Sequence, residues 1–371
     1  MDLLTRRYLT LALTPNLGPR TIKMLTEHFG DAEAVYGASE NELRQTPGIG
    51  PKLARNIIEA RDSDKPEKEL ARAEKAGVRV LCLVHPDYPE ALRQIYDPPP
   101  VLYLRGRLPP SLSGPVEGLR SVAIVGTRNA SDYALDFSLQ LAKDLAASRV
   151  TVISGLARGV DAAAHRGAVL SEGGQTVAVL GSGVDVIYPR ENTRLAEDML
   201  AGHGAIMSEY PLGTQPRAEH FPSRNRIVSG LSRAVVVVEG TRKSGSLITA
   251  NFALEEGRTV FAVPGRAGDP RAGGTLDLLK QGAVLIQDAG DILNELGWSA
   301  VAKEEVARPA LSDAEARLVK LIAAKDSPLL DDLIVASGES AATLLPVLMV
   351  LELKGVIKAV PGGRYISLLR D

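Results

Sequence analysis

The chain has 371 residues, which corresponds to roughly two or three folded domains of ordinary size. Because 45% of the residues are hydrophobic and 24% are charged, the composition is that of a globular protein and excludes collagen-like, coiled-coil and wholly disordered chains. The 43 basic and 45 acidic residues give a net charge of −2, so an anionic partner has to be bound by a local basic patch.

The N-terminal block, residues 1–62, contains two glycine-rich turns between helical runs. Gly48 and Gly50 flank Ile49 ahead of one run, and a weaker copy of the pattern begins at Pro15. The spacing indicates a helix-hairpin-helix, in which glycines let the turn approach a phosphate and the next helix offers unpaired N–H groups. The acidic and basic residues of the block balance, however, so a protein-packing role stays open beside DNA binding.

Two features of the chain bear on its compartment. The apolar run Tyr8–Leu13 is too short to span a membrane and lacks the small residues of a cleavage site. The one cysteine, Cys82, can form neither an internal disulfide nor a multi-thiolate metal cluster, which excludes disulfide scaffolds and zinc ribbons. We therefore expect a cytoplasmic protein that has no membrane partner and carries an inert thiol.

Residues 65–107 begin within a charged stretch at Arg61–Glu67. They predict a helix, then an apolar run at Val78–Val84, then a second run at Val101–Leu104 after three prolines. We expect this segment to extend the sheet that follows.

From about residue 120 to 298, short apolar runs rich in β-branched residues alternate with helical stretches. This alternation is typical of βαβ units, in which consecutive strands of a sheet run parallel. The predicted buried strands are Val122–Val125, Val150–Ile153, Thr176–Leu180, Ala205–Met207, Ala234–Val238, Thr259–Val263 and Ala283–Ile286. The sequence thus predicts an α/β domain over residues 63–298 with a doubly wound, mostly parallel sheet.

Glycines and hydroxyl residues recur where these strands end, and ligands of open parallel sheets bind beyond those ends. Small residues there let backbone N–H groups and helix N-termini reach phosphate oxygens, and nearby cations add to the attraction. Any one such loop could be an ordinary turn, but together they predict an anion-binding crevice. The strand-end segments are Gly126-Thr127-Arg128, Ser154-Gly155, Gly181-Ser182-Gly183, Glu239–Ser246 and Pro264-Gly265.

Residues 217–243 form the one strongly basic segment of the chain. Its cations are Arg217, Arg224, Arg226, Arg233, Arg242 and Lys243, against the two acids Glu219 and Glu239. Phe221 lies among these arginines, as in sites where a base of single-stranded nucleic acid stacks on a ring while a guanidinium holds the phosphate. The alternative is that Phe221 packs at a helix start and Arg224 pairs with a carboxylate.

Several enzyme chemistries lack their residues. The run Gly240–Ser246 has Ser where a P-loop has Lys, and Gly181-Ser-Gly183 lacks the third glycine of a dinucleotide fingerprint. Asp161 and His165 share a helical face, but a helix-start Asp and a partly buried His explain this spacing without catalysis. The histidines show no metal-ligand spacing. We expect no cofactor, no metal and no enzymatic activity.

The C-terminal block, residues 309–371, follows a predicted linker over residues 299–308. Its three helical runs, Asp313–Ala324, Leu330–Ser337 and Ser340–Leu353, and a glycine-turned hairpin predict a winged helix. The third helix has no Lys, Arg, Asn or Gln, which are the donors that base readout needs. We therefore favour protein contact over groove recognition, with exposed apolar residues among Leu344, Leu345, Leu348 and Met349.

Several of these motifs together closely resemble the DprA (Smf) family of DNA-processing proteins. The motifs are Phe221-Pro-Ser-Arg-Asn-Arg-Ile-Val-Ser-Gly-Leu-Ser, Ser244-Gly-Ser-Leu-Ile-Thr-Ala, Val260-Phe-Ala-Val-Pro-Gly, Gly126-Thr-Arg, Ser154-Gly-Leu-Ala-Arg-Gly-Val-Asp and Leu180-Gly-Ser-Gly-Val-Asp. The resemblance spans about residues 120–290, and both flanking blocks agree with the organisation of the family. It implies an extended Rossmann-like sheet flanked by an N-terminal SAM-like helix-hairpin-helix domain and a C-terminal winged helix.

The resemblance also implies a function. It predicts a homodimer that binds and protects single-stranded DNA, loads the recombinase RecA onto it in natural transformation, and has single-strand-binding protein as a further partner. With the strand-end loops, the predicted DNA-binding residues are Gly126, Arg128, Ser154, Gly155, Gly181, Ser182, Arg217, Phe221, Arg224, Asn225, Arg226, Lys243, Ser244 and Gly245. The chain departs from the family pattern at Thr127, where Ser is usual, and at Leu276, where Asn is common.

One alternative belongs to a different class of protein. Rossmann-like phosphoribohydrolases that resemble the lysine-decarboxylase-like superfamily carry a Pro-Gly-Gly-x-Gly-Thr run followed by glutamates at the helix start that is here Ser244–Thr249. The segment lacks the carboxylate that such hydrolysis needs, so nucleotide hydrolysis remains the weaker alternative.

Overall fold

The computed structural model describes residues 3–298, 311–325, 327–360 and 362–367. The chain divides into two compact units, residues 1–301 and residues 302–371, and each is described by itself. The linker predicted over residues 299–308 lies outside the described residues.

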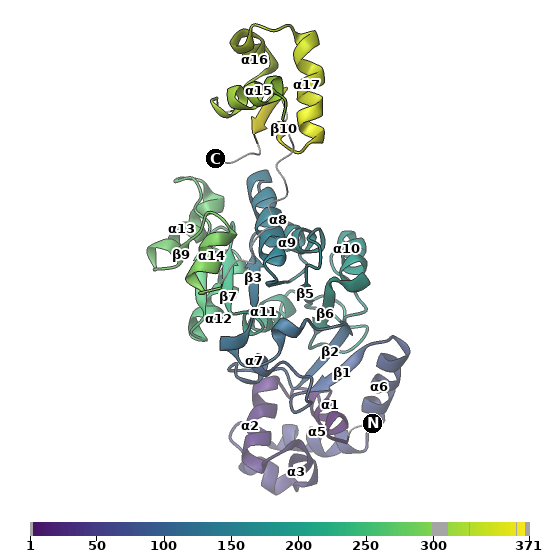
Figure 1. Ribbon diagram of the computed structural model, residues 1–371. Coiled ribbons are helices and arrows are strands. Elements are labelled where there is room, and N and C mark those ends of the chain that lie inside the picture. The colour runs from purple at the N-terminus through teal and green to yellow at the C-terminus, as the bar shows by residue number, and fades with distance from the viewer. Residues whose placement is uncertain (1–2, 299–310, 326, 361, 368–371) are drawn as a thin grey trace. The chain divides into compact units, whose positions relative to one another are not determined.

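A nine-stranded sheet forms the centre of the first unit (Figure 1). Its order is β1-β2-β6-β5-β4-β3-β7-β8-β9, and every neighbouring pair from β6 to β9 is parallel. The strands are β1 (Arg79–Cys82), β2 (Val101–Gly106), β3 (Ser121–Val125), β4 (Thr151–Ser154), β5 (Thr176–Val179), β6 (Gly204–Ser208), β7 (Ala234–Val237), β8 (Thr259–Ala262) and β9 (Val284–Leu285). The predicted fold class, a doubly wound and mostly parallel sheet, is confirmed.

Helices cover both faces of this sheet, which explains why its central strands are mainly apolar and are buried along their length. The helices of the first unit are α1 (Leu3–Ala12), α2 (Pro19–Phe29), α3 (Ala32–Gly37), α4 (Glu40–Gln45), α5 (Pro51–Arg61), α6 (Lys65–Lys75), α7 (Glu90–Arg93), α8 (Asp132–Ala147), α9 (Val160–Val169), α10 (Thr193–Asp198), α11 (His220–Gly230), α12 (Ser246–Glu255), α13 (Gly273–Lys280) and α14 (Ala289–Glu295). Val122 and Ile124 of β3 pack with α8, α9 and α14, whereas Ala123 and Val125 pack with α11 and α12.

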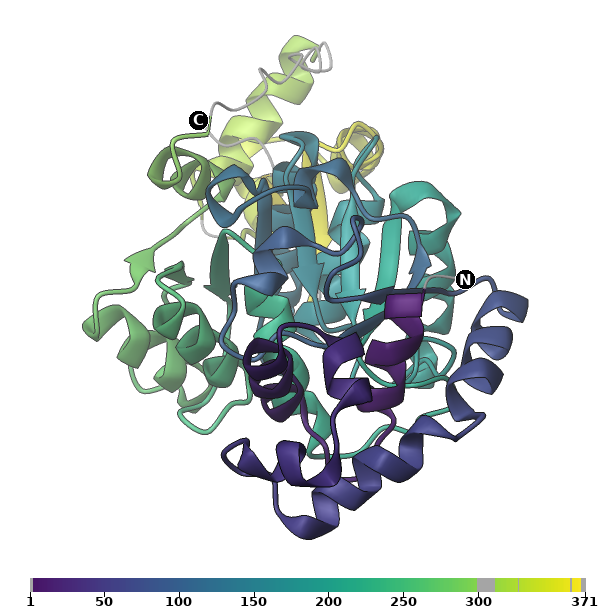
Figure 2. The same cartoon turned by 90° about the horizontal axis from the view of Figure 1, so that it is seen from below.

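The N-terminal helices lie beside β1 and β2 and are purple in Figures 1 and 2. Leu9 of α1 and Ile57 of α5 share one hydrophobic cluster with Tyr103 of β2 and Ile206 of β6. Residues 1–62 belong to the same compact unit as the sheet, and the domain boundary predicted at residue 62 stays a prediction. β1 pairs antiparallel with β2, and β2 pairs antiparallel with β6, so residues 65–107 extend the sheet as predicted. Cys82 is fully buried in this region.

The second unit is a winged helix, as predicted. It contains α15 (Asp313–Ala323), α16 (Leu330–Ser337), α17 (Ala341–Leu353) and an antiparallel hairpin of β10 (Ile357–Val360) and β11 (Arg364–Ser367). Leu344, Leu348 and Leu351 of α17 point into its core, while Leu345 and Met349 are 46% and 66% exposed. The predicted surplus of apolar side chains on this helix is therefore present at Leu345 and Met349.

No single helix within the described ranges has the length and apolar character to cross a membrane. α16 and α17 pass that test of length and composition only as a pair, and they meet at a bend of 113°.

Candidate functional site

An open crevice lies at the carboxyl ends of the parallel strands, at the point where the strand order reverses. β3 is flanked by β4 and by β7, and the loops after β3 and β7 lead to helices on opposite faces of the sheet. The crevice has a volume of about 620 Å³. Its lining residues are Val125, Gly126, Thr127, Arg128, Ala157, Asp161, Tyr188, Pro216, Arg217, Ala218, Phe221, Pro222, Arg224, Asn225, Thr241, Ser244, Gly245, Ser246, Ile248 and Thr249.

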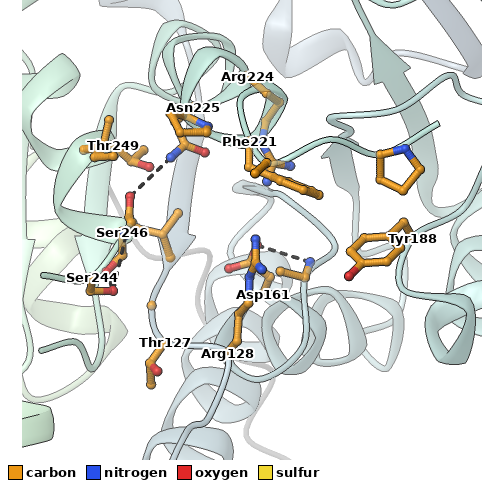
Figure 3. Close-up of a pocket in the computed structure, with 18 of the residues that line it drawn as sticks. Thr127, Arg128, Asp161, Tyr188, Phe221, Arg224, Asn225, Ser244, Ser246 and Thr249 are labelled. Carbon is orange, nitrogen blue, oxygen red and sulfur yellow. Dashed lines mark hydrogen bonds between the residues drawn. The ribbon is translucent and has the colours of Figure 1, made fainter. Parts of the chain in front are cut away.

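The loop after β3 requires glycine at position 126. The Cβ of any other residue would lie 2.5 Å from a side-chain carbon of Val160 and 3.0 Å from the carbonyl oxygen of Glu239. The backbone N–H of Thr127 donates to the same carbonyl over 2.8 Å. This close approach joins the loops after β3 and β7, and it places the exposed side chain of Arg128 in the crevice (Figure 3).

Aromatic rings form one wall of the crevice. The guanidinium of Arg128 lies 4.9 Å from the ring centroid of Phe221, a half-buried residue in the first turn of α11. The ring of Tyr188, which is 43% exposed, lies 5.8 Å from the ring of Phe221. Gly181 makes room behind Phe221, because an added Cβ would lie 3.1 Å from a ring carbon. The wall is therefore an accessible aromatic surface with a cation on it, as Figure 3 shows.

The opposite wall is the start of α12. Ser244, Gly245 and Ser246 line the crevice, so the positive end of the α12 dipole faces it. The side-chain amide of Asn225 on α11 donates to the carbonyl of Gly245 over 3.2 Å and fixes this loop. With the exposed side chain of Arg217 nearby, the wall favours a bound anion.

Arg224 forms the floor of the crevice and is 4% exposed. Its Nη1 donates to the carbonyl oxygens of Gly155, over 2.8 Å, and of Val179. Gly155 has to be glycine, because a Cβ there would lie 2.3 Å from the guanidinium. Burial lowers the pKa of Arg224 to about 10, against the opposing charge of Asp161. Arg224 is therefore a structural tie between strand ends, and its hydrogen bonds go to carbonyls and not to a carboxylate.

Asp161 is the one carboxylate among the described residues that line the crevice, and it is largely buried. It accepts the backbone N–H groups of Gly155, over 3.1 Å, and Ala157, over 3.3 Å. Burial raises the pKa of this carboxyl, although the charge of Arg224 opposes the rise. His165, one helical turn further on, is fully buried and its Nδ1 lies 2.7 Å from the hydroxyl of Thr176. Each member of this pair thus has a structural partner.

Arg226 was expected in the same pocket, but the structure places it elsewhere. Two residues along a helix correspond to a turn of about 200°, so Arg226 points away from the side of α11 that carries Arg224. It forms an ion pair of 2.6 Å with Glu209, in which both side chains are at least nine-tenths buried. It also donates to the carbonyl of Asp97 over 2.8 Å.

Other predicted residues lie beside the crevice and not in its lining. Ser154 is fully buried, and its hydroxyl donates to the carbonyl of Ile124 over 2.6 Å. The hydroxyl of Ser182 donates to the carbonyl of Val186 over 2.7 Å. Lys243 is exposed and lines a neighbouring groove. Of the predicted residues, the structure brings together Gly126, Arg128, Arg217, Phe221, Arg224, Asn225, Ser244 and Gly245.

Sequence reasoning missed Tyr188 and Thr249 as lining residues. Tyr188 follows the glycine-rich turn after β5, and an aromatic residue in a strand-end loop is the signal that would have found it. Thr249 stands three residues after Ser246, so helical spacing places both on one face of α12. In the ranges that the structure covers, no cluster of three or more His, Cys, Asp or Glu side chains is placed to hold a metal ion.

Comparison with known proteins matches three family models to consecutive parts of the chain. The SAM-like helix-hairpin-helix tandem matches residues 9–62. The model described as DNA recombination-mediator protein A matches residues 79–297, and the DprA winged helix domain matches residues 302–363.

Individual proteins agree with these matches. Protein Smf of Synechocystis is 35% identical over 393 aligned residues, which cover 96% of this chain and 97% of that protein. The X-ray structure of DNA processing protein A from Streptococcus pneumoniae has a TM-score of 0.67 at 32% identity and covers 80% of this chain and 99% of that one. A structure of DNA processing protein A from Helicobacter pylori, which concerns its single-stranded DNA binding mode, has a TM-score of 0.51 at 30% identity and covers 59% of this chain and 95% of that one.

Proposed function

The chain belongs to the DNA recombination-mediator protein A family, and from this premise and the geometry of the crevice we propose that it binds single-stranded DNA at the carboxyl edge of its sheet. The observation that carries the proposal is the accessible ring of Phe221 with the guanidinium of Arg128 4.9 Å from its centroid. Stacking on an aromatic ring next to a cation suits an unpaired base and its phosphate, whereas the bases of a duplex have no free faces.

The two walls of the crevice bind different parts of a nucleotide. A base stacks on Phe221 or Tyr188, and the phosphate next to it lies between the exposed arginines and the start of α12. Backbone and side-chain groups supply hydrogen bonds to the sugar and phosphate oxygens. The proposed contact residues are Gly126, Arg128, Arg217, Phe221, Asn225, Ser244 and Gly245, with Ser154, Gly155, Gly181, Ser182 and Arg224 holding the loops that carry them.

Binding without bond cleavage fits these residues better than nucleotide hydrolysis does. Hydrolysis of a glycosidic bond needs a carboxyl group that reaches the substrate. Asp161, the one carboxylate in the described lining, is held by two backbone N–H groups and is 7% exposed. This geometry supports a protein that acts by binding and handing over its ligand.

We also propose the partners that the resemblance to the family implies. The protein forms a homodimer and loads RecA onto the bound strand in natural transformation. Single-strand-binding protein is a further partner. Because the recombinase would act in the cytoplasm, we propose the same location for this protein. In support of a second copy, Leu285 on the edge strand β9 is 50% exposed and Leu254 near the end of α12 is 52% exposed.

A binding titration by fluorescence anisotropy tests the proposal. The affinities for single-stranded and duplex oligonucleotides of equal length are compared between the unmodified 371-residue chain and the Phe221→Ala variant. We expect preference for the single strand and a loss of about 1–3 kcal/mol in Phe221→Ala, because one stacking contact is removed.

Tyr96→Ala is the matched control. Tyr96 is 66% exposed, carries the guanidinium of Arg20 at 5.2 Å from its ring centroid, and lies outside the crevice. Equal affinity of Phe221→Ala and Tyr96→Ala for the single strand would remove the crevice as the binding site. Release of free base from nucleoside monophosphates over many turnovers would favour the hydrolase alternative.

A further inference from the structure

A second cavity begins where the crevice ends. It has a volume of about 510 Å³, lies between α12 and α13, and shares Ser244 and Ile248 with the crevice. Ile248, which is 37% exposed, forms the ridge between the two cavities. A single DNA strand that leaves the crevice over the first turn of α12 would therefore enter this groove.

The wall of the groove is held in place by close packing. Gly274 on α13 would bring an added Cβ to 2.7 Å from the carbonyl oxygen of Gly240 and 2.8 Å from that of Thr241, so only glycine lets α13 approach this closely. The ion pair between Arg242 and Asp277, 2.7 Å long, ties the same loop to α13. The guanidinium of Arg242 is therefore already paired with a carboxylate of the wall.

Three side chains of the groove have the chemistry to bind a nucleotide. Lys243 is exposed and forms no ion pair with any residue that the structure describes, so it can neutralise a phosphate. The carboxamides of Asn251 and Gln281 line the groove and are exposed, and such groups donate to and accept from base edges. The apolar side chains of Leu247 and Leu278 supply a surface on which a base can lie.

We propose that the groove between α12 and α13 is a second nucleotide subsite, which binds the residue of single-stranded DNA next to the one held in the crevice. The proposal rests on the proposed function, because the strand reaches the groove only from the crevice. It adds a place and a direction: the bound strand crosses α12 at Ile248 and runs toward Asn251 and Gln281.

The buried cysteine makes a site-specific test feasible. Because Cys82 is fully buried, Asn251→Cys and Gln281→Cys each carry the one accessible thiol in the described part of the chain. The rate of labelling of that thiol by a maleimide is measured without DNA, with a short oligothymidylate and with a long one. Gln140→Cys, at an exposed position on α8 outside both cavities, is the matched control.

We expect a saturating long oligothymidylate to slow the labelling of residues 251 and 281 by roughly tenfold, as for a site that is about nine-tenths occupied. Labelling at residue 140 should not change. In a separate titration, the double variant Asn251→Ala/Gln281→Ala should bind the long oligonucleotide roughly tenfold more weakly, the loss that corresponds to about one net hydrogen bond from each amide.

The two proposals fail in different ways. If the long oligonucleotide binds with an affinity that depends on Phe221 but leaves both thiols fully reactive, the groove is not on the path of the strand while the crevice stands. If no single-stranded DNA binds at all, the proposed function itself is overturned.

Discussion

At the scale of single residues, two arginines of the same short segment have opposite roles. Arg224 is 4% exposed and is bound to strand-end carbonyls, whereas Arg217 is exposed at the rim of the same crevice. Removal of a buried guanidinium leaves its carbonyl partners without donors in a dry environment, while removal of an exposed one costs the fold little.

We therefore expect Arg224→Ala to lower the free energy of unfolding by about 3 kcal/mol, because buried hydrogen bonds to a charged group are lost. The free energy of unfolding of Arg217→Ala should lie within about 0.5 kcal/mol of that of the parent protein. Its affinity for single-stranded DNA should nevertheless be lower. Urea denaturation and binding titrations of both variants check the pair. Similar stabilities of the two variants would show that the tie between the strand ends is dispensable.

His165 gives the fold a dependence on pH. Burial lowers the pKa of its imidazole to about 3 in the folded protein, against about 6.5 in an unfolded chain. Between these values the unfolded chain binds the extra proton, so the stability conferred by the neutral ring is complete above pH of about 6.5 and falls as the pH is lowered toward 3.

The stability advantage of the parent protein over His165→Gln should shrink by up to about 1.4 kcal/mol per pH unit as the pH falls from about 6 to about 4. Urea denaturation across this range measures it, and the same replacement at the exposed His28 controls for the loss of a histidine. A difference in stability that stays constant with pH would contradict the prediction.

At the scale of elements, α8 and α9 approach so closely that a methyl group does not fit between them. A Cβ on Gly167 of α9 would lie 2.1 Å from the carbonyl oxygen of Leu139 and 2.9 Å from the Cβ of Ala142, both on α8. Helix propensity alone favours alanine over glycine by roughly 1 kcal/mol. Here the steric term has the opposite sign and is larger.

We expect Gly167→Ala to lower the free energy of unfolding by about 1–3 kcal/mol, as for an overpacked core. Gly37→Ala at the end of α3 is the control, since nothing lies within 4 Å of an added Cβ there. Denaturant midpoints of the two variants decide the matter, and a stabilised Gly167→Ala variant would mean that the helices can move apart without cost.

Elements were easier to predict from the sequence than side-chain directions. β3 and β7 are buried on both faces, so unbroken apolar runs mark them clearly. β9 is shorter than its predicted run because it is the edge strand and pairs only with β8. Arg224 and Arg226 look equivalent in sequence, and only the turn of α11 and the position of Glu209 separate their roles. Tyr188 enters the crevice through a loop whose path no local pattern fixes.

At the scale of the whole molecule, the second unit is separable from the proposed DNA site. The crevice is built wholly from the first unit, and α17 has none of the amide and cationic side chains that read bases. Among nearby cations, Lys354 is paired with Glu315 over 2.6 Å and Arg364 donates to the carbonyl of Ser327. The exposed side chains Leu345 and Met349 suit contact with a protein.

A protein that ends at residue 301 should therefore keep most of its affinity for single-stranded DNA. The slope of log affinity against log salt should differ from that of the 371-residue chain by no more than the change expected for about one phosphate contact. Titrations at several salt concentrations measure both quantities. Loss of binding, together with a slope that is shallower by about two phosphate contacts, would make the second unit a principal DNA surface.

The guanidinium of Arg128 on the ring of Phe221 has a thermodynamic consequence for release of the ligand. In the empty crevice the ring already has a neighbour, so an arriving base exchanges one partner of the ring for another. The gain is the difference between a stacking term of about 1–3 kcal/mol and a cation–π term of about 0.5–2 kcal/mol. Each nucleotide is then held with a small margin. Because Arg128 is also proposed to contact the phosphate, Arg128→Leu should weaken binding and speed dissociation in stopped-flow measurements, although it frees the ring of Phe221. Under the proposed function, a second protein that binds the same DNA strand can then displace this protein one nucleotide at a time.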